Sequence, residues 1–214
     1  MIYLEETLNL VPASPETLDI FVELAQNRLV PLLKRFESRL VAAWFTDVEL
    51  FCQVKQILEF DSIGAFETFR IEAGKDPEWK KIETRIEELA PERYSRLLEP
   101  LESIPPETLH KAAVQSQESP LGVYSLAILD VAPGKMPKFI AALEEAAKRF
   151  PIVASWRSIT GKQNEVIDVW KGALRQERYK PADDFTKEFF RGVREMAPRE
   201  RVIPVYSLPY SELR

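Results

Sequence analysis

The chain has 214 residues, enough for two domains of about 100 residues each, and its 45% hydrophobic and 29% charged residues are ordinary for a globular protein. A net charge of −5 argues against nucleic-acid binding, which needs a basic surface, and no stretch approaches the roughly 20 apolar residues that span a bilayer. The N-terminus lacks a basic and then apolar leader, so we expect a cytoplasmic protein without membrane insertion. One histidine and one cysteine are too few for the usual haem, zinc or iron sites, so the expected cofactor is none and the expected metal is none.

The first half of the chain predicts the order strand, helix, strand, strand, helix, strand. Ser14 and Pro15 suit an N-cap and a first helical residue, and Pro31 predicts a kink or a break in the helix that follows. The expected elements are a strand at 2–11, a helix from 15 to 36, a hairpin at 39–46 and 51–60, a helical segment after 61–62 and a main helix from 76 to 90.

The second half repeats this order. The expected elements are a strand at 123–131, a helix to about 149, a hairpin at 152–171, a helix ending near 196 and a strand at 200–208. Residues 40–60 align without a gap on 152–172, and residues 76–93 align on 183–200. Two aligned blocks in the same order indicate a tandem duplication.

The duplication predicts an α+β fold with two ferredoxin-like domains, 1–105 and 121–214, joined by a linker at 106–120. A ferredoxin-like sheet carries helices on one face and leaves the other bare. We therefore expect the two bare faces to pack sheet to sheet as a closed α/β-barrel within one chain.

The sequence resembles the NIPSNAP family of the dimeric α/β-barrel superfamily. The resemblance rests on five segments: MIYLEETLNLVPAS, CQVKQILEFDS and DPEW in the first copy, and APGK and QNEVIDVW in the second. It implies the barrel fold, and its superfamily includes cofactor-free monooxygenases, isomerases, dehydratases and haem-degrading enzymes. The Asn and His that the family usually carries on its third strand would fall on Asn164 and Asp168, and on Cys52 and Gln56 in the first copy, so the family's His is absent from both.

The hairpin at 152–171 can be paired residue by residue. A tight turn at Gly161 and Lys162 sets Ser155 opposite Asp168 and Trp156 opposite Ile167. The apolar face that holds Trp156 is expected under the helices. The other face is expected to line the barrel interior with Ser155, Arg157, Asn164, Val166, Asp168 and Trp170.

Arg157 and Asp168 are then diagonal neighbours, either as a polar anchor for a ligand or as a structural ion pair. The equivalent interior positions of the first copy, among them Phe45 and Gln56, are far less polar. Lys55 conflicts with this assignment, because it would lie on the helix face.

The leading functional hypothesis is a barrel that binds a small, partly apolar molecule, with the question of a cofactor-free enzyme left open. Its candidate ligand-binding residues are Asp168, Arg157, Asn164, Ser155, Trp170, Gln56 and Phe45. The alternative is a non-catalytic scaffold or protein-interaction module whose barrel is a filled core. Further homo-oligomerisation is left open in both cases.

Overall fold

Within residues 1–172 and 183–214, which this computed structural model describes, eight antiparallel strands close into one barrel. Around the barrel the strands follow the order β1-β3-β2-β8-β5-β7-β6-β4. Their bounds are β1 Ile2–Asn9, β2 Arg39–Thr46, β3 Gln53–Phe60, β4 Glu92–Pro100, β5 Val123–Asp130, β6 Ile152–Ser158, β7 Glu165–Lys171 and β8 Arg199–Ser207. Four strands from each half lie together, which confirms two tandem ferredoxin-like repeats in an intrachain α/β-barrel.

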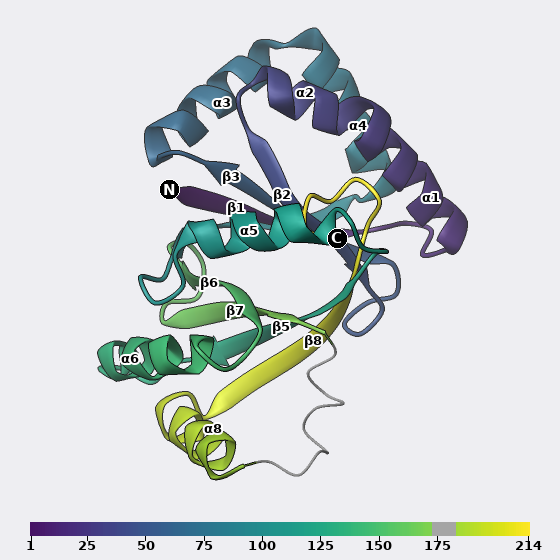
Figure 1. Cartoon of the computed structure of the whole chain (residues 1–214). Helices are drawn as coiled ribbons and strands as arrows, with labels where there is room; N and C mark the ends of the chain where they lie inside the picture. The colour runs from purple at the N-terminus through teal and green to yellow at the C-terminus, as the bar shows by residue number, and fades with distance from the viewer. Residues whose placement is uncertain (173–182) are drawn as a thin grey trace.

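The helices lie outside the barrel, one set over each half (Figure 1). Their bounds are α1 Pro15–Leu24, η1 Ala25–Leu29, α2 Val30–Arg35, α3 Ile63–Lys75 and α4 Pro77–Leu89 in the first half, α5 Pro106–Ser116 between the halves, and α6 Met136–Ala147 and α8 Asp184–Met196 in the second half. No helix of the described part is long and apolar enough to cross a membrane.

The predicted helix starts are confirmed by their caps. Ser14 Oγ accepts a hydrogen bond from the Thr17 backbone N–H at 3.2 Å, and Asp76 Oδ1 accepts two from the start of α4. Pro31 does not end its helix. The wider π-helical turn η1 lies directly before α2, in whose first turn Pro31 sits. Pro31 has no backbone N–H to donate, and the hydrogen bond from the Val30 N–H to the Ala25 carbonyl, which spans five residues, lies directly before it.

The two halves meet through short strand pairs and through the segments that follow β4 and β8. Strand β2 pairs with β8, and β4 pairs with β6, over only two or three residues each. Beyond β8, the Leu208 N–H donates to the Ala43 carbonyl at 2.9 Å; beyond β4, the Leu101 N–H donates to the Ser155 carbonyl at 3.0 Å. Each half therefore sends its last segment across to the other half.

The barrel lumen is filled by apolar side chains from both halves. Tyr3, Trp44, Tyr124 and Trp156 are all fully buried there, and the Tyr3 and Trp156 rings lie 5.3 Å apart. The helix α5, which occupies the proposed linker, adds Leu109 to this cluster. The domain boundaries at 105 and 121 stay a prediction.

His110 of α5 is only partly exposed, and its Nε2 lies 2.7 Å from Glu59 Oε2.

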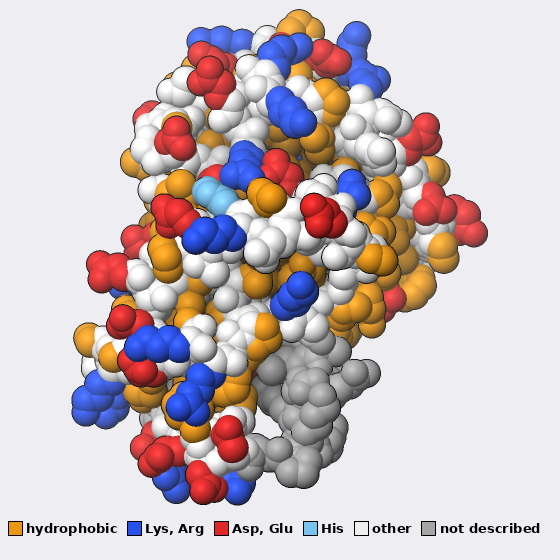
Figure 2. Space-filling view, viewed as in Figure 1, with side chains coloured by type: hydrophobic (Ala, Val, Ile, Leu, Met, Phe, Trp, Pro, Cys, Tyr) orange, Lys and Arg blue, Asp and Glu red, His pale blue; other side chains and the backbone are white. Residues whose placement is uncertain are grey.

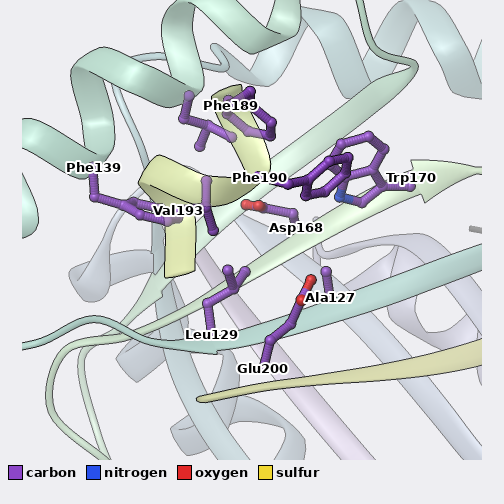
Figure 3. A pocket seen from close by; sticks show the side chains of 10 residues that line it. Ala127, Leu129, Phe139, Asp168, Trp170, Phe189, Phe190, Val193 and Glu200 are labelled. Atoms are coloured by element: carbon purple, nitrogen blue, oxygen red, sulfur yellow. The ribbon is translucent and has the colours of Figure 1, made fainter. Parts of the chain in front are cut away.

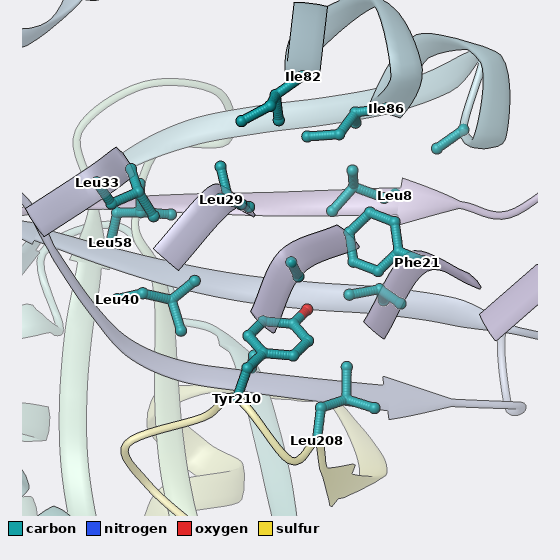
Figure 4. Packing of buried hydrophobic residues seen from close by; sticks show 14 of the residues in the cluster. Leu8, Phe21, Leu29, Leu33, Leu40, Leu58, Ile82, Ile86, Leu208 and Tyr210 are labelled. Carbon is teal, nitrogen blue, oxygen red and sulfur yellow. The ribbon is translucent and has the colours of Figure 1, made fainter. Parts of the chain in front are cut away.

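The helix-covered face of the first half forms a separate core (Figure 4). Leu8, Phe21 and Leu33 meet there, joined by Leu208 and Tyr210 from the C-terminal segment. On the outside, Lys and Arg side chains are interspersed with Asp and Glu over the face seen in Figure 2.

Candidate functional site

The register predicted for the hairpin of β6 and β7 is confirmed, but its faces are reversed. Ser155 pairs with Asp168, and Trp156 pairs with Ile167. Trp156 and Ile167 pack in the lumen against residues of the first half. The opposite face, with Val166 and Trp170, packs on the helices α6 and α8. The prediction that Asp168 lines the lumen was therefore wrong.

The reversal has a physical reason. Both faces of a barrel strand are buried, so greater hydrophobicity does not identify the helix-covered face. The lumen takes the two largest apolar side chains of the strands, Trp44 and Trp156, both of which are almost completely buried. The helix-covered layer accommodates a polar pair because Ser155 Oγ donates a hydrogen bond to Asp168 Oδ1 at 2.5 Å.

The predicted pair of Arg157 and Asp168 does not form. Arg157 is exposed, and its Nε donates to Glu99 Oε1 on β4 at 2.8 Å. Asn164, expected in the lumen, is exposed in the turn before β7 with a φ of 58°. Of the second-half candidates, Ser155, Asp168 and Trp170 thus come together, while Arg157 and Asn164 lie apart from them.

Asp168 lines a small pocket between the sheet and the helices α6 and α8 (Figure 3). Its cavity is about 10 Å³, at the lower limit for one water molecule. The wall is mostly apolar and consists of Ala127, Leu129, Phe139, Leu143, Trp170, Phe189, Phe190 and Val193, with Asp168 and Glu200 as the acidic members. Trp170 is buried, and its Nε1 has no hydrogen-bond partner among the described residues.

The environment of Asp168 favours its protonated form. Burial raises the pKa of this carboxyl to about 7; the Ser155 hydroxyl lowers the pKa and the negative charge of Glu200 raises it. Glu200 is itself held by an ion pair with Arg194 at 2.5 Å. A carboxyl with a pKa near neutrality can both accept and donate a proton under ordinary conditions.

The first half has a matching pocket of about 30 Å³ under its own helices, lined in part by Glu6, Gln56 and Arg93. Gln56 occupies the position equivalent to Asp168 and accepts a hydrogen bond from the Tyr210 hydroxyl at 2.9 Å. Burial raises the pKa of Glu6, although Arg93 acts against it. Phe45 also lies on the helix side, stacked on the Tyr206 ring, so the lumen positions predicted for Gln56 and Phe45 were wrong.

Sequence reasoning missed Glu200, Glu6 and Tyr210 because no local motif marks them. A signal was nevertheless present in Lys55, which conflicted with the assumed faces. In the structure Lys55 belongs to the lumen side, as that conflict implied. No group of three or more His, Cys, Asp or Glu side chains in the described residues is arranged to hold a metal ion.

Comparisons with solved structures place the chain in the class of dimeric α/β-barrels. It resembles a putative monooxygenase from Lactobacillus acidophilus NCFM with a TM-score of 0.62 and 14% identity, over 96% of this chain and 93% of that chain. It also resembles an anthrone oxidase-like protein, with a TM-score of 0.57 and 10% identity over 96% and 90% of the two chains. At such identities the likeness shows the fold alone.

A family model matches the first half of the chain. Residues 12–105 match the NIPSNAP family model, and the second half repeats the fold of the first. A search of curated proteins gave no match.

Proposed function

We propose that this protein binds a small, partly apolar molecule with an acidic hydroxyl or enol group in the Asp168 pocket. The observation that carries the proposal is a buried carboxyl with a pKa near 7 in a mostly aromatic and aliphatic wall. In this role the Asp168 carboxylate accepts the proton of the ligand, and the surrounding side chains exclude water from the resulting anion.

Two features support a flat, aromatic ligand. Trp170 offers both a ring face and an Nε1–H donor that has no partner among the described residues, and Phe189 and Phe190 of α8 line the same pocket (Figure 3). The structures of similar fold, described as a putative monooxygenase and an anthrone oxidase-like protein, make phenols and anthrones the first ligand class to test.

The cavity must enlarge to admit such a ligand, because about 10 Å³ holds at most one water. The displaceable wall is α8. Phe189 and Phe190 are only half-buried, and they contact each other and Phe150 in a surface aromatic cluster. Displacement of the Phe190 side chain would open the pocket beside Trp170, because both residues line it.

The test is a titration with anthrone and 2-naphthol, followed by quenching of tryptophan fluorescence. We expect saturable quenching, its loss in Trp170→Phe, and binding weakened about tenfold or more in Asp168→Asn, which cannot accept the proton. Asp61→Asn, the same change on an exposed carboxyl, should bind as the wild type does. Equal binding by Asp168→Asn and wild type would contradict the proposal.

A second candidate is a non-catalytic scaffold with a filled barrel. The fully buried Tyr3, Trp44, Tyr124 and Trp156 in the lumen favour it. This candidate would be favoured over ligand binding if neither probe bound saturably and the tryptophan fluorescence of the protein did not change between pH 5 and 9.

A further inference from the structure

A second cavity lies at one mouth of the barrel, away from Asp168. Its volume is about 520 Å³, within the usual range for small-molecule sites. It is lined by residues of β1, β3 and β4, by the loop before β3, by Ile128 of β5, by the β6–β7 turn and by Arg201 of β8. None of these residues belongs to the Asp168 pocket.

The duplication makes this mouth asymmetric. At equivalent lumen positions the first half has charged and polar side chains where the second half has aliphatic ones. The equivalent pairs are Glu5 and Leu126, Thr7 and Ile128, Lys55 and Ile167, and Arg96 and Ile203. Four polar residues at the edge of a hydrophobic lumen cost free energy unless each finds a hydrogen-bond or ion-pair partner.

The positive charge of Arg96 is neutralised by two carboxylates. Its guanidinium forms ion pairs with Glu5 and Glu165, both of which are buried. Lys55 is held more loosely. Its Nζ lies 3.3 Å from Thr7 Oγ1 and 3.6 Å from Glu49 Oε2. Glu49 also forms an ion pair with Arg201.

Lys55 is 5% exposed and lines the cavity, so its amino group is both desolvated and accessible to a small molecule. Burial lowers its pKa and the charge of Arg96 lowers it further, against Glu5 and Glu49, which raise it. A desolvated lysine next to another cation is the usual environment of a nucleophilic amine.

Gln53 gives a second and independent indication of a ligand. It is 4% exposed, lines the same cavity, and lies two residues before Lys55 on the same face of β3. Its Nε2 donates to Asn9 Oδ1 at 2.9 Å, but its Oε1 has no hydrogen-bond partner among the described residues. A buried acceptor without a donor fits a hydroxyl group of a bound molecule.

We propose that the barrel mouth binds a small hydroxylated aldehyde or ketone, and that Lys55 forms an imine with its carbonyl carbon while Gln53 accepts a hydrogen bond from its hydroxyl. The neutral amine attacks the carbonyl, the carbinolamine loses one water molecule, and a C=N bond replaces the C=O bond. No oxidant or metal enters this step.

The experiment traps the imine in the intact protein. The wild type is incubated with glycolaldehyde and sodium cyanoborohydride, which reduces the imine to a stable secondary amine, and the labelled lysines are located by peptide mass spectrometry. We expect Lys55 to be labelled about tenfold faster than the exposed lysines Lys148 and Lys187. Labelling of Lys55 no faster than these two would overturn the proposal.

A comparison of probes tests the role of Gln53. Gln53→Leu should slow labelling of Lys55 by glycolaldehyde about threefold or more, and should leave labelling by propanal, which lacks the hydroxyl, unchanged. An equal effect on both probes would overturn the assigned hydroxyl contact. Circular dichroism of the variant shows whether it is folded, and a variant that does not fold is replaced by Gln53→Glu, in which labelling by glycolaldehyde should persist.

Discussion

At the scale of single residues, the buried position of Asp168 disfavours the charged form of its carboxyl group. In the unfolded chain its carboxyl has a pKa near 3.8, and in the folded protein the pKa is about 7. The native state therefore binds the proton more tightly. Between these two values the folding free energy becomes less favourable as the pH rises, and the total loss is roughly 4 kcal/mol.

Replacing Asp168 by Asn should remove this pH dependence. The amide is uncharged and can still accept the hydrogen bond of Ser155. We expect Asp168→Asn to match the wild type near pH 4 and to exceed its stability at pH 8 by up to roughly 4 kcal/mol, measured by urea unfolding. Asp61→Asn serves as the control. A stability difference that is the same at pH 4 and pH 8 would argue against a buried carboxyl with a raised pKa.

The lumen tryptophans can be tested by truncation. Trp156 is 2% exposed and contacts Tyr3, whereas Trp79 on α4 is half-buried. We expect Trp156→Ala to destabilise the protein by about 3 to 5 kcal/mol and Trp79→Ala to cost about 1 to 2 kcal/mol, by equilibrium unfolding. Equal costs would show that the lumen is not the tighter core.

At the scale of elements, the segment after β8 is part of the first half's core. Tyr210 reaches Gln56 under the helices, and Leu213 enters the lumen cluster, where its N–H donates to the Val41 carbonyl at 3.0 Å. The segment after β4 does the same for the second half through Leu101 and Ile104. Each half is thus completed by the other half's last segment.

This exchange of segments predicts that a substitution in the segment after β8 strongly lowers the stability of the protein. Leu213→Ala should lower the free energy of unfolding by about 2 to 4 kcal/mol, because Leu213 is fully buried. Pro209→Ala, in the same segment but exposed, should change it by no more than about 0.5 kcal/mol. Similar melting temperatures for Leu213→Ala and the wild type would contradict the proposed role of the segment.

At the scale of the whole molecule, the lumen core belongs to neither half alone. It draws side chains from β1 to β8, and α5 adds Leu109 to it. Separating the halves would expose this core to water on both sides. The two repeats therefore depend on one another for their largest shared hydrophobic contact.

We expect a single cooperative unfolding transition for the whole chain. The four tryptophans report on different places: Trp44 and Trp156 on the lumen, Trp79 on the first half's helices and Trp170 on the second half's. Their fluorescence and the far-ultraviolet circular dichroism should give the same midpoint in urea. Two separate transitions would mean that the repeats fold independently.

Local rules explain why so much of the fold could be predicted. The cap residues Ser14 and Asp76 start their helices as expected, and the pairing of Ser155 with Asp168 follows from turn position and period-two alternation. The repeated blocks predicted the duplication and, from it, the closed barrel. All of these depend on neighbours in sequence or on the comparison of one half with the other.

The candidate site could be predicted only in part. Alternation separated Ser155, Asp168 and Trp170 from Trp156, but it could not say which face meets the helices, because both are buried in a barrel that helices cover. The Lys55 conflict was the one signal in the sequence that the faces were reversed.

The sequence by itself determined the two repeats, the order of strands and helices, and which residues share a face, since these follow from spacing along the chain. Only the tertiary structure decided that the tryptophans fill the lumen, that Asp168 lies beneath α8, and that Lys55 lies beside Arg96 at the barrel mouth. These placements depend on which sheet face closes on the other half, and that choice is made by the packing of all eight strands together.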